Sequence, residues 1–398
     1  MMPGYSTNEW TKYISLEMGE IEICDVTLRD GEQTPGVAFT REEKIDIARM
    51  LDEIGIEVIE AGFPATSQGE KESVKAIASL GLNAKICCLS RAIKSDIDAV
   101  LDCGADMVGM FVGTSDLHLK YKHKKTQDEI IDCAVEALEY AKRHGLIVRF
   151  SPEDGSRTGL DFLKRFYRAG EEAGADYVGA IDTVGIMTPA TMRFMVGEIR
   201  KTVKLPIAVH CHDDLGMAVA NTLAAAEAGA KQLHTTTNGI GERAGNAALE
   251  EVLVNLRIQY GVDKYDTTKI TDLSKMVQKY SGICAAKNKA VVGDHAFAHE
   301  SGIHIAALLE NDRTYEVFSP ELVGGRREFI LGKHSGGKAL CYMARQMGYT
   351  LSEAETTQVL CEIKRLSELK KSIHRNELKD LIDHVVGQRY STPEASAP

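Results

Sequence analysis

The chain has 398 residues, of which 44% are hydrophobic and 26% are charged, and this composition is typical of a globular protein with a large core. The formal net charge of −11, from 47 basic and 58 acidic residues, argues against a nucleic-acid-binding or anionic-membrane-binding protein. A polar N-terminus, no apolar run of membrane-spanning length and nine cysteines without zinc-site spacing predict a cytoplasmic protein with no membrane partner.

Short β-rich segments alternate with helix-like stretches from about residue 20 to about residue 260. The β-rich segments are 21–26, 57–61, 84–89, 107–112, 146–150, 177–181, 207–210 and 232–235. Apolar residues between them recur at three- and four-residue spacing, and many of these stretches end in Gly, as helices do. Eight β/α units predict an α/β fold, a closed (β/α)8 TIM barrel; an open doubly wound sheet is the alternative.

The β/α rhythm stops near residue 262, and a loop-rich part followed by charged helical segments comes after it. We therefore expect a smaller, mostly helical domain appended to the barrel. The predicted organisation is an N-terminal extension over 1–19, a catalytic barrel over 20–265, C-terminal subdomains over 266–387 and a disordered tail over 388–398.

Two imidazoles and a carboxylate follow predicted strands. His210 and His212 are two residues apart at the end of the seventh strand, so their side chains point to the same side. Asp30 follows the first strand, whose end neighbours theirs in a closed barrel. Such a set can hold one divalent cation with positions left open for substrate. The alternative is a hydrogen-bonded histidine pair without a metal.

Other polar side chains gather at the same predicted face, where barrel enzymes form their active sites. They are Arg29, Gln33, Glu60, Arg149, Ser151, Glu153, Asp154, Asp182 and Thr183. Core packing does not explain so many ionisable groups at one end of a barrel, so we interpret this face as the active site.

A Gly-rich segment, 238–246, follows the eighth strand and ends in Asn246. It precedes a helix, whose N-terminus favours phosphate or oxygen ligands. The alternative is a turn that closes the barrel. In the appended domain, His299, His304 and Tyr315 are either surface and capping residues or a source of general acid/base catalysis at a barrel mouth.

Three long motifs carry a family resemblance. Thr27-Leu28-Arg29-Asp30-Gly31-Glu32-Gln33, His210-Cys211-His212-Asp213-Asp214 and the segment 238–251 resemble signatures of the isopropylmalate, citramalate and homocitrate synthases. These enzymes form the acyl-CoA-condensing branch of the TIM-barrel metallolyases. The resemblance covers roughly residues 20 to 385 and is greatest to the short archaeal and nitrogen-fixation type homocitrate synthases.

The resemblance implies a divalent metal, Mg²⁺, Mn²⁺ or Zn²⁺, held by Asp30, His210 and His212 with Asn246 nearby. The metal would bind the carboxylate and keto oxygen of a 2-oxo acid. The family pattern further assigns Arg29 to the charge that develops on the keto oxygen, and Gln33 and Thr183 to the substrate carboxylates.

The resemblance also matches Glu153 and His304, supported by Tyr315, to the acid/base groups. These groups remove a methyl proton from the co-substrate acetyl-CoA and later assist hydrolysis of the thioester. In the family the segment that carries His304 reaches the barrel of a neighbouring subunit, which implies a homodimer whose active site is completed in trans.

Arg149 and Ser151 favour 2-oxoglutarate as the acceptor, because this arginine is similar to the one that homocitrate synthases use for a distal carboxylate. Isopropylmalate synthases usually differ there and usually carry a further C-terminal regulatory domain. Leu89 stands where many lysine-pathway homocitrate synthases have histidine, and Gly109 replaces a polar residue and leaves room for a longer substrate. We predict a homocitrate synthase; the alternatives are 2-isopropylmalate, (R)-citramalate or Re-type citrate synthase.

Two other classes of protein remain open. One is a metal-dependent barrel lyase that cleaves a hydroxyacyl-CoA or a 4-hydroxy-2-oxo acid, although the long motif at 238–251 and the appended domain argue against it. The other is a binding protein without catalysis, which would not need a complete set of metal ligands.

Overall fold

The computed structural model describes residues 8–13, 18–369, 373 and 375–389. Much of the predicted extension, and the predicted disordered tail from residue 390 on, lie outside the described residues. The chain divides into two compact units between Ala285 and Ala286. We keep 20–265 as our proposal for the catalytic barrel; the unit that contains it extends to Ala285 and includes one further helix.

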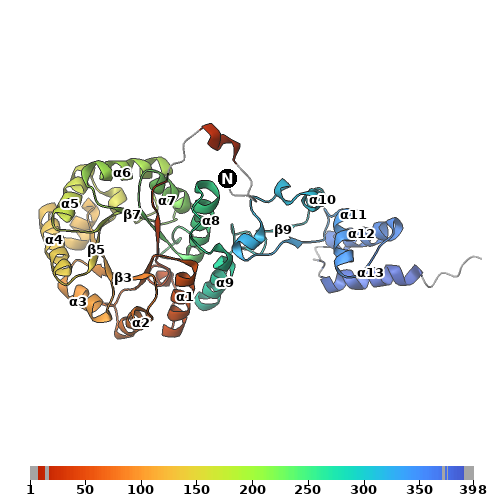
Figure 1. Ribbon diagram of the computed structural model, residues 1–398, viewed down its shortest axis with the longest axis horizontal. Coiled ribbons are helices and arrows are strands. Elements are labelled where there is room, and N and C mark those ends of the chain that lie inside the picture. Colours follow the sequence, from red (N-terminus) through yellow and green to blue (C-terminus); the bar gives the residue numbers. More distant parts are fainter. Residues whose placement is uncertain (1–7, 14–17, 370–372, 374, 390–398) are drawn as a thin grey trace, which may run out of the picture. The chain divides into compact units, whose positions relative to one another are not determined.

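Eight parallel strands form a closed barrel in chain order, in which β1 pairs with both β2 and β8 (Figure 1). The strands are β1 (Glu22–Asp25), β2 (Val58–Gly62), β3 (Lys85–Arg91), β4 (Met107–Gly113), β5 (Ile147–Glu153), β6 (Tyr177–Asp182), β7 (Ile207–Cys211) and β8 (Gln232–Thr235). Each overlaps a predicted segment. The predicted TIM barrel is therefore confirmed, and the open doubly wound sheet is wrong.

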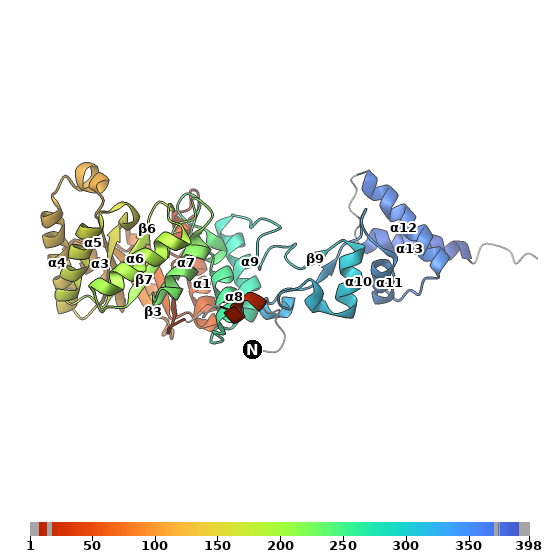
Figure 2. The same cartoon turned by 90° about the horizontal axis from the view of Figure 1, so that it is seen from above.

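Helices follow the strands and form the outer ring of the barrel, beside the strands in both views (Figures 1 and 2). They are α1 (Arg41–Ile54), α2 (Gln68–Ala78), α3 (Lys94–Cys103), α4 (Gln127–Arg143), α5 (Leu160–Glu172), α6 (Pro189–Thr202), α7 (Ala218–Glu227) and α8 (Leu249–Tyr260). Capping boxes at Thr40, Thr126 and Thr188 satisfy backbone groups at the starts of α1, α4 and α6. Left-handed glycines end α1, α3 and α8.

The helix α9 (Ile270–Ser281) packs against α1 and belongs to the barrel unit. Two side-chain contacts hold it there: the Ser274 hydroxyl donates to Oδ1 of Asn238, and the Tyr280 hydroxyl donates to Asp46 at 2.9 Å. The first contact ties α9 to the Gly-rich segment that follows β8.

Small and apolar side chains fill the barrel below its polar face. Cys24, Val26, Val58, Cys87 and Met107 form one buried cluster contributed by the first four strands and the residue after β1. Because these residues exclude water, polar side chains that border the cluster lie in a medium of low dielectric, where charges interact strongly.

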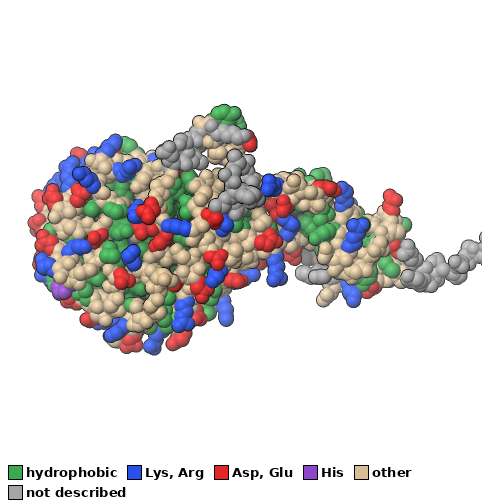
Figure 3. All heavy atoms as spheres, in the orientation of Figure 1, with side chains coloured by type: hydrophobic (Ala, Val, Ile, Leu, Met, Phe, Trp, Pro, Cys, Tyr) green, Lys and Arg blue, Asp and Glu red, His purple; other side chains and the backbone are tan. Residues whose placement is uncertain are grey.

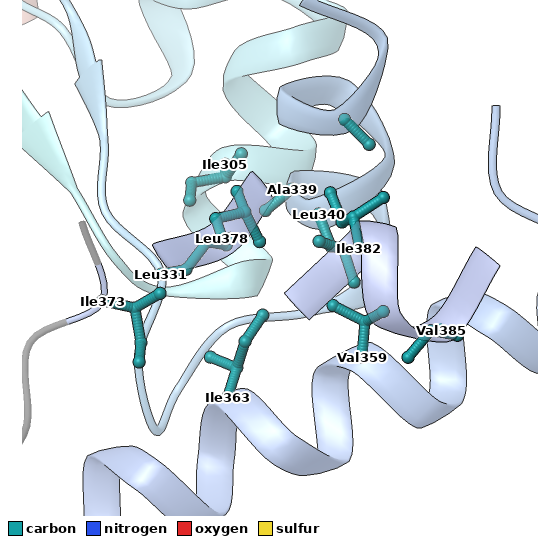
Figure 4. Packing of buried hydrophobic residues seen from close by; sticks show 11 residues of the cluster. Ile305, Leu331, Ala339, Leu340, Val359, Ile363, Ile373, Leu378, Ile382 and Val385 are labelled. Carbon is teal, nitrogen blue, oxygen red and sulfur yellow. The ribbon is translucent and has the colours of Figure 1, made fainter. Parts of the chain in front are cut away.

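The second unit contains α10 (Gly302–Glu310), α11 (Gly337–Gln346), α12 (Glu353–Glu368), α13 (Arg375–Arg389) and a two-stranded sheet of β9 (Ala298–His299) and β10 (Glu328–Phe329). Its core is a single cluster in which residues of α10 to α13 converge with Leu331 and Ile373 (Figure 4). The predicted helical C-terminal region is confirmed.

Acidic and basic side chains are interspersed over the face of the barrel that Figure 3 shows. Among the described residues, no helix combines the length and the apolar character that a membrane span requires. All nine cysteines are free thiols.

Candidate active site

Asp30, His210 and His212 lie together, all three nearly inaccessible to solvent. The Nε2 atoms of the two histidines are 3.2 Å apart, and Oδ2 of Asp30 lies 3.4 Å from Nε2 of His210 and 3.9 Å from that of His212. We expected the end of the first strand to neighbour that of the seventh, but this was wrong, because β8 lies between β7 and β1. Asp30, in the turn after β1, therefore reaches past β8 to meet the histidines. Among the described residues this is the one cluster with the composition and spacing of a metal site.

The charge states of this set suit a cation. Although burial opposes ionisation, the neighbouring Arg29 guanidinium holds the pKa of Asp30 well below its ordinary value. Burial and the neighbouring His210 lower the pKa of His212 to about 4. Nδ1 of His212 lies 3.1 Å from the carbonyl oxygen of Gly245, which can only accept, so Nδ1 carries the proton and Nε2 offers a lone pair.

Asn246 adds a further oxygen at this position. Its Nδ2 donates to Oδ1 of Asp30 at 3.2 Å and to the carbonyl of Ile240 at 3.3 Å. Its Oδ1 is buried and has no hydrogen-bond partner among the described residues. A buried amide oxygen without a partner is costly unless it binds something, and a divalent cation would satisfy it. The residues present therefore fit a metal ion with nitrogen and oxygen ligands.

Glu60, the third residue of β2, joins two arginines. Its Oε1 accepts from Nε of Arg29 and its Oε2 from Nη2 of Arg149. Burial opposes its ionisation, yet the two guanidinium groups hold the pKa of Glu60 below its ordinary value. Arg29 also donates from Nη1 to Asp30 at 2.7 Å and to Gln33 at 3.3 Å. Arg29 is thus fixed between the candidate metal ligand and the barrel interior, with exposed Gln33 beside it.

Arg149 crosses the barrel interior from β5 and is almost completely buried. Its Nη1 donates to Oε1 of Gln232 at 3.0 Å and contacts Sγ of Cys24 at 3.5 Å, and its Nη2 pairs with Glu60. These contacts account for three of the five N–H groups of a guanidinium. Arg149 therefore retains donors beyond those that hold it in place.

Two glycines make room for the β5 side chains. At Gly109, on β4, an added Cβ would overlap Nη2 of Arg149 and lie 3.2 Å from Oε2 of Glu60. At Gly179, on β6, it would lie 2.5 Å from the hydroxyl of Ser151. The space that Gly109 leaves is thus filled by the Arg149 guanidinium, whereas our sequence interpretation gave it to a longer substrate.

Glu153 and Thr183 stand at the ends of β5 and β6. Oε1 of Glu153 accepts from Nζ of Lys122 at 2.8 Å, and Oε2 lies 3.6 Å from Nδ1 of His118. The hydroxyl of Thr183 accepts from the backbone N–H of Asp154 at 2.8 Å, so its own proton remains available to donate.

A cavity of about 280 Å³ brings these groups together. Nine of the twelve residues predicted for the site line it: Arg29, Asp30, Gln33, Arg149, Ser151, Glu153, Thr183, His210 and His212. A tenth, Asn246, contacts Asp30 from outside the lining. Leu89, Gly109, Met110, Phe111 and Ile181 form its apolar side. A cavity of this size suits a small molecule with several polar groups.

The other two predicted residues belong to the second unit. His304 is exposed on α10, and its ring stacks on that of Tyr315, with centroids 4.0 Å apart. The stack gives the pair a shared orientation at the surface of this unit.

Sequence reasoning did not assign His118, Lys122, Gln232, His234 and Arg243, which contact the predicted site. Arg243 binds Asp214 through Nε at 2.8 Å and the carbonyl of Thr183 through Nη2 at 2.7 Å, so it links the loops after β6, β7 and β8. Its place inside the Gly-rich motif was the available signal. Gln232 and His234 are two residues apart on β8, and both side chains face the barrel interior. Their spacing was the available signal, because residues at i and i+2 of a strand lie on the same face.

Comparison with known proteins places the chain among barrel enzymes. An HMGL-like family model matches residues 20–277, and a second model, described as homocitrate synthase post-HMGL domain-like, matches residues 291–371. The fold is similar to that of a crystal structure of HMG-CoA lyase from Bacillus subtilis, with a TM-score of 0.60 and 21% identity over 66% of this chain and 94% of that one. Fold and site therefore define a (β/α)8-barrel enzyme of the HMGL-like class.

Relatives narrow the assignment. The chain is 55% identical to homocitrate synthase AksA of Methanosarcina acetivorans over 98% of this chain and 97% of the relative. It is 50% identical to 2-isopropylmalate synthase of Methanocaldococcus jannaschii over 92% of this chain and 72% of the relative. The chain belongs to the family of the homocitrate synthases and the related 2-isopropylmalate synthases.

The packing of Arg149 against Gly109 yields a prediction about stability. Gly109→Ala should destabilise the fold by about 1–3 kcal/mol, because the added methyl group displaces the buried guanidinium from Glu60. Urea denaturation measures this change. Gly197→Ala, within α6, is the matched control and should be neutral or stabilising, because beyond the adjacent backbone of α6 nothing lies within 4 Å of the added carbon. Equal behaviour of the two variants would contradict the role given to Gly109.

Proposed function

We propose that the protein is a metal-dependent homocitrate synthase, which condenses acetyl-CoA with 2-oxoglutarate and water to give homocitrate and CoA. The observation that carries the choice of acceptor is Arg149: a buried cation with donors to spare lies in the wall of the same cavity as the metal-site residues. A second carboxylate on the substrate needs such a partner, whereas a branched apolar side chain would leave it unmatched.

Charge balance supports a dicarboxylate. Arg29 forms ion pairs with Asp30 and Glu60, and Arg149 forms an ion pair with Glu60. Two carboxylates thus compensate the charges of two guanidinium groups. The charges of these four groups cancel, so a bound divalent cation would add two positive charges beside them. A 2-oxo dicarboxylate carries two negative charges and would restore neutrality in this buried setting.

A divalent cation held by Asp30, His210 and His212, with Asn246 beside them, would polarise the keto carbonyl of the acceptor. Around it, the chain's own residues bind and orient the substrates. We assign Thr183 and Gln33 to the carboxylate next to the keto group, and Arg149 with Ser151 to the distal carboxylate; all four residues line the cavity.

The reaction also requires proton transfer. A base removes a proton from the acetyl methyl group, the resulting carbanion forms a C–C bond with the keto carbon, and Arg29 stabilises negative charge on the keto oxygen. Hydrolysis of the thioester then consumes one water and releases CoA. We assign the acid/base roles to Glu153, whose Oε1 accepts from Nζ of Lys122, and to His304 with Tyr315.

We propose that His304 and Tyr315 of one chain serve the barrel of a second chain in a homodimer. Both side chains are at least partly exposed, so they are available to a neighbouring molecule. Their stacked rings offer an oriented imidazole, which is what a general acid or base needs.

Acceptor selectivity tests the proposed reaction. Release of CoA, followed with a thiol reagent, should be fastest with 2-oxoglutarate and slower with 2-oxoisovalerate, pyruvate and oxaloacetate. Arg149→Met should lower kcat/KM for 2-oxoglutarate by about 100-fold or more and affect pyruvate less, because pyruvate has no distal carboxylate.

Two outcomes would oppose the assignment: faster turnover of 2-oxoisovalerate by the wild type, or equal losses on both acids in Arg149→Met. The double variant with Glu60→Gln removes the carboxylate that Arg149→Met leaves underpaired, so it separates lost substrate binding from a buried charge.

Metal dependence is tested by removing the ion. Dialysis against a chelator should abolish CoA release, and Mn²⁺, Mg²⁺ or Zn²⁺ should restore it. Asp30→Asn should bind Co²⁺ more than about tenfold more weakly than the wild type, measured by competition with a coloured chelator. The exposed Asp116→Asn is the control and should bind as the wild type does. Unchanged turnover after complete metal removal would refute metal dependence.

Completion of the site in trans predicts complementation. Arg29→Ala and His304→Ala should each be inactive alone. When they are mixed under conditions that exchange subunits, activity should recover to about one quarter of the wild-type value, because only mixed dimers contain one intact site. Absence of recovery, with subunit exchange shown by mass spectrometry, would argue for a site built within one chain.

A further inference from the structure

A line of buried polar groups runs from Arg149 to His210 along the inside of β8. Nη1 of Arg149 lies 3.0 Å from Oε1 of Gln232, the same oxygen lies 3.2 Å from Nε2 of His234, and Nδ1 of His234 lies 3.3 Å from Nδ1 of His210. Gln232, His234 and Arg149 are each at most 3% exposed. Water cannot substitute for these contacts, so the donors and acceptors must match one another.

The arginine fixes the direction of every bond in this line. A guanidinium can only donate, so the Gln232 atom that faces it must be the amide oxygen. Because the same oxygen faces Nε2 of His234, that nitrogen must carry the proton. Nδ1 of His234 is then an acceptor, and the proton between the two imidazoles must sit on Nδ1 of His210.

The consequence appears at the other side of the His210 ring. A neutral imidazole with its proton on Nδ1 has an unshared electron pair on Nε2, the atom that lies beside Asp30 and His212. The reverse tautomer would place the carbonyl oxygen of Gln232 against an unprotonated nitrogen of His234, and two acceptors repel. The favoured tautomer also brings two acceptors together, Nε2 of His210 and Nε2 of His212 at 3.2 Å, but at the position where a divalent cation would bind both. The buried line thus selects the tautomer of His210 that can ligate a metal.

We propose that Gln232 and His234 are positioning residues that hold His210 ready for a divalent cation and tie it to the arginine in the substrate cavity. The proposal rests on the metal site of the proposed function and adds the residues that prepare it. Gln232 does not line the cavity and acts through Arg149 and His234; His234 lines the cavity and acts on the cation through His210.

Variants at position 234 test the proposal in metal-free, full-length protein. His234→Leu removes the acceptor for Nδ1–H of His210, and Co²⁺ should bind about 10–100-fold more weakly. His234→Asn is the conservative variant, since its Oδ1 stands where Nδ1 stood and can accept the same hydrogen; it should recover most of the affinity. His144→Asn, at an exposed histidine after α4, should bind as the wild type does.

Wild-type affinity in a folded His234→Leu variant would overturn the proposal. So would equal losses in the Leu and Asn variants, because packing and not the hydrogen bond would then explain them. Thermal unfolding shows whether each variant is folded.

Nitrogen-15 NMR of histidine-labelled, metal-free wild type supplies a measurement that needs neither a variant nor a metal. Nε2 of His210, assigned by its absence in His210→Asn, should give the shift of an unprotonated nitrogen. A protonated Nε2 would overturn the proposal. Failure of the wild type to bind Co²⁺ would instead count against the metal site itself, and the NMR result would still decide the tautomer.

Discussion

The site depends on one buried carboxylate shared by two arginines. Glu60 has no exposure to solvent, and it holds Arg29 toward the candidate metal ligands and Arg149 across the barrel interior. Removing one partner from such a buried group is far more costly than the pair is stabilising, because the remaining charge cannot be hydrated. The positions of the two arginines in the cavity are therefore set by their pairing with Glu60 inside the barrel, and residues of the loops form the rest of the cavity wall.

The sequence predicted the barrel because the strands are short apolar segments and many of the helices end at a glycine. It also predicted the residues at the ends of strands, since parallel strands all end at the same face. It could not predict that the Arg149 guanidinium occupies the space beside Gly109, because that contact depends on the register between β4 and β5. For the same reason Glu60 was noted at a strand end but given no partner.

The polar residues of β8 were missed for another physical reason. In a strand that reads Gln232-Leu233-His234-Thr235, alternation predicts one polar face, and a polar face usually points to solvent. In a closed barrel the inward face can be polar when a charged side chain such as Arg149 crosses it. The role proposed for Gln232 and His234 follows from the direction of their hydrogen bonds, and a sequence pattern contains no information on that direction.

The shared carboxylate also limits how acceptor preference can change through mutation. Replacing Arg149 by an apolar residue, as a branched-chain acid would require, leaves Glu60 and the amide of Gln232 each short of a partner inside the barrel. A change of acceptor preference therefore needs coordinated replacements on β2, β5 and β8. A single replacement at one of these positions lowers the stability of the fold. In enzymes with this arrangement, a change of substrate should therefore be accompanied by several substitutions at once.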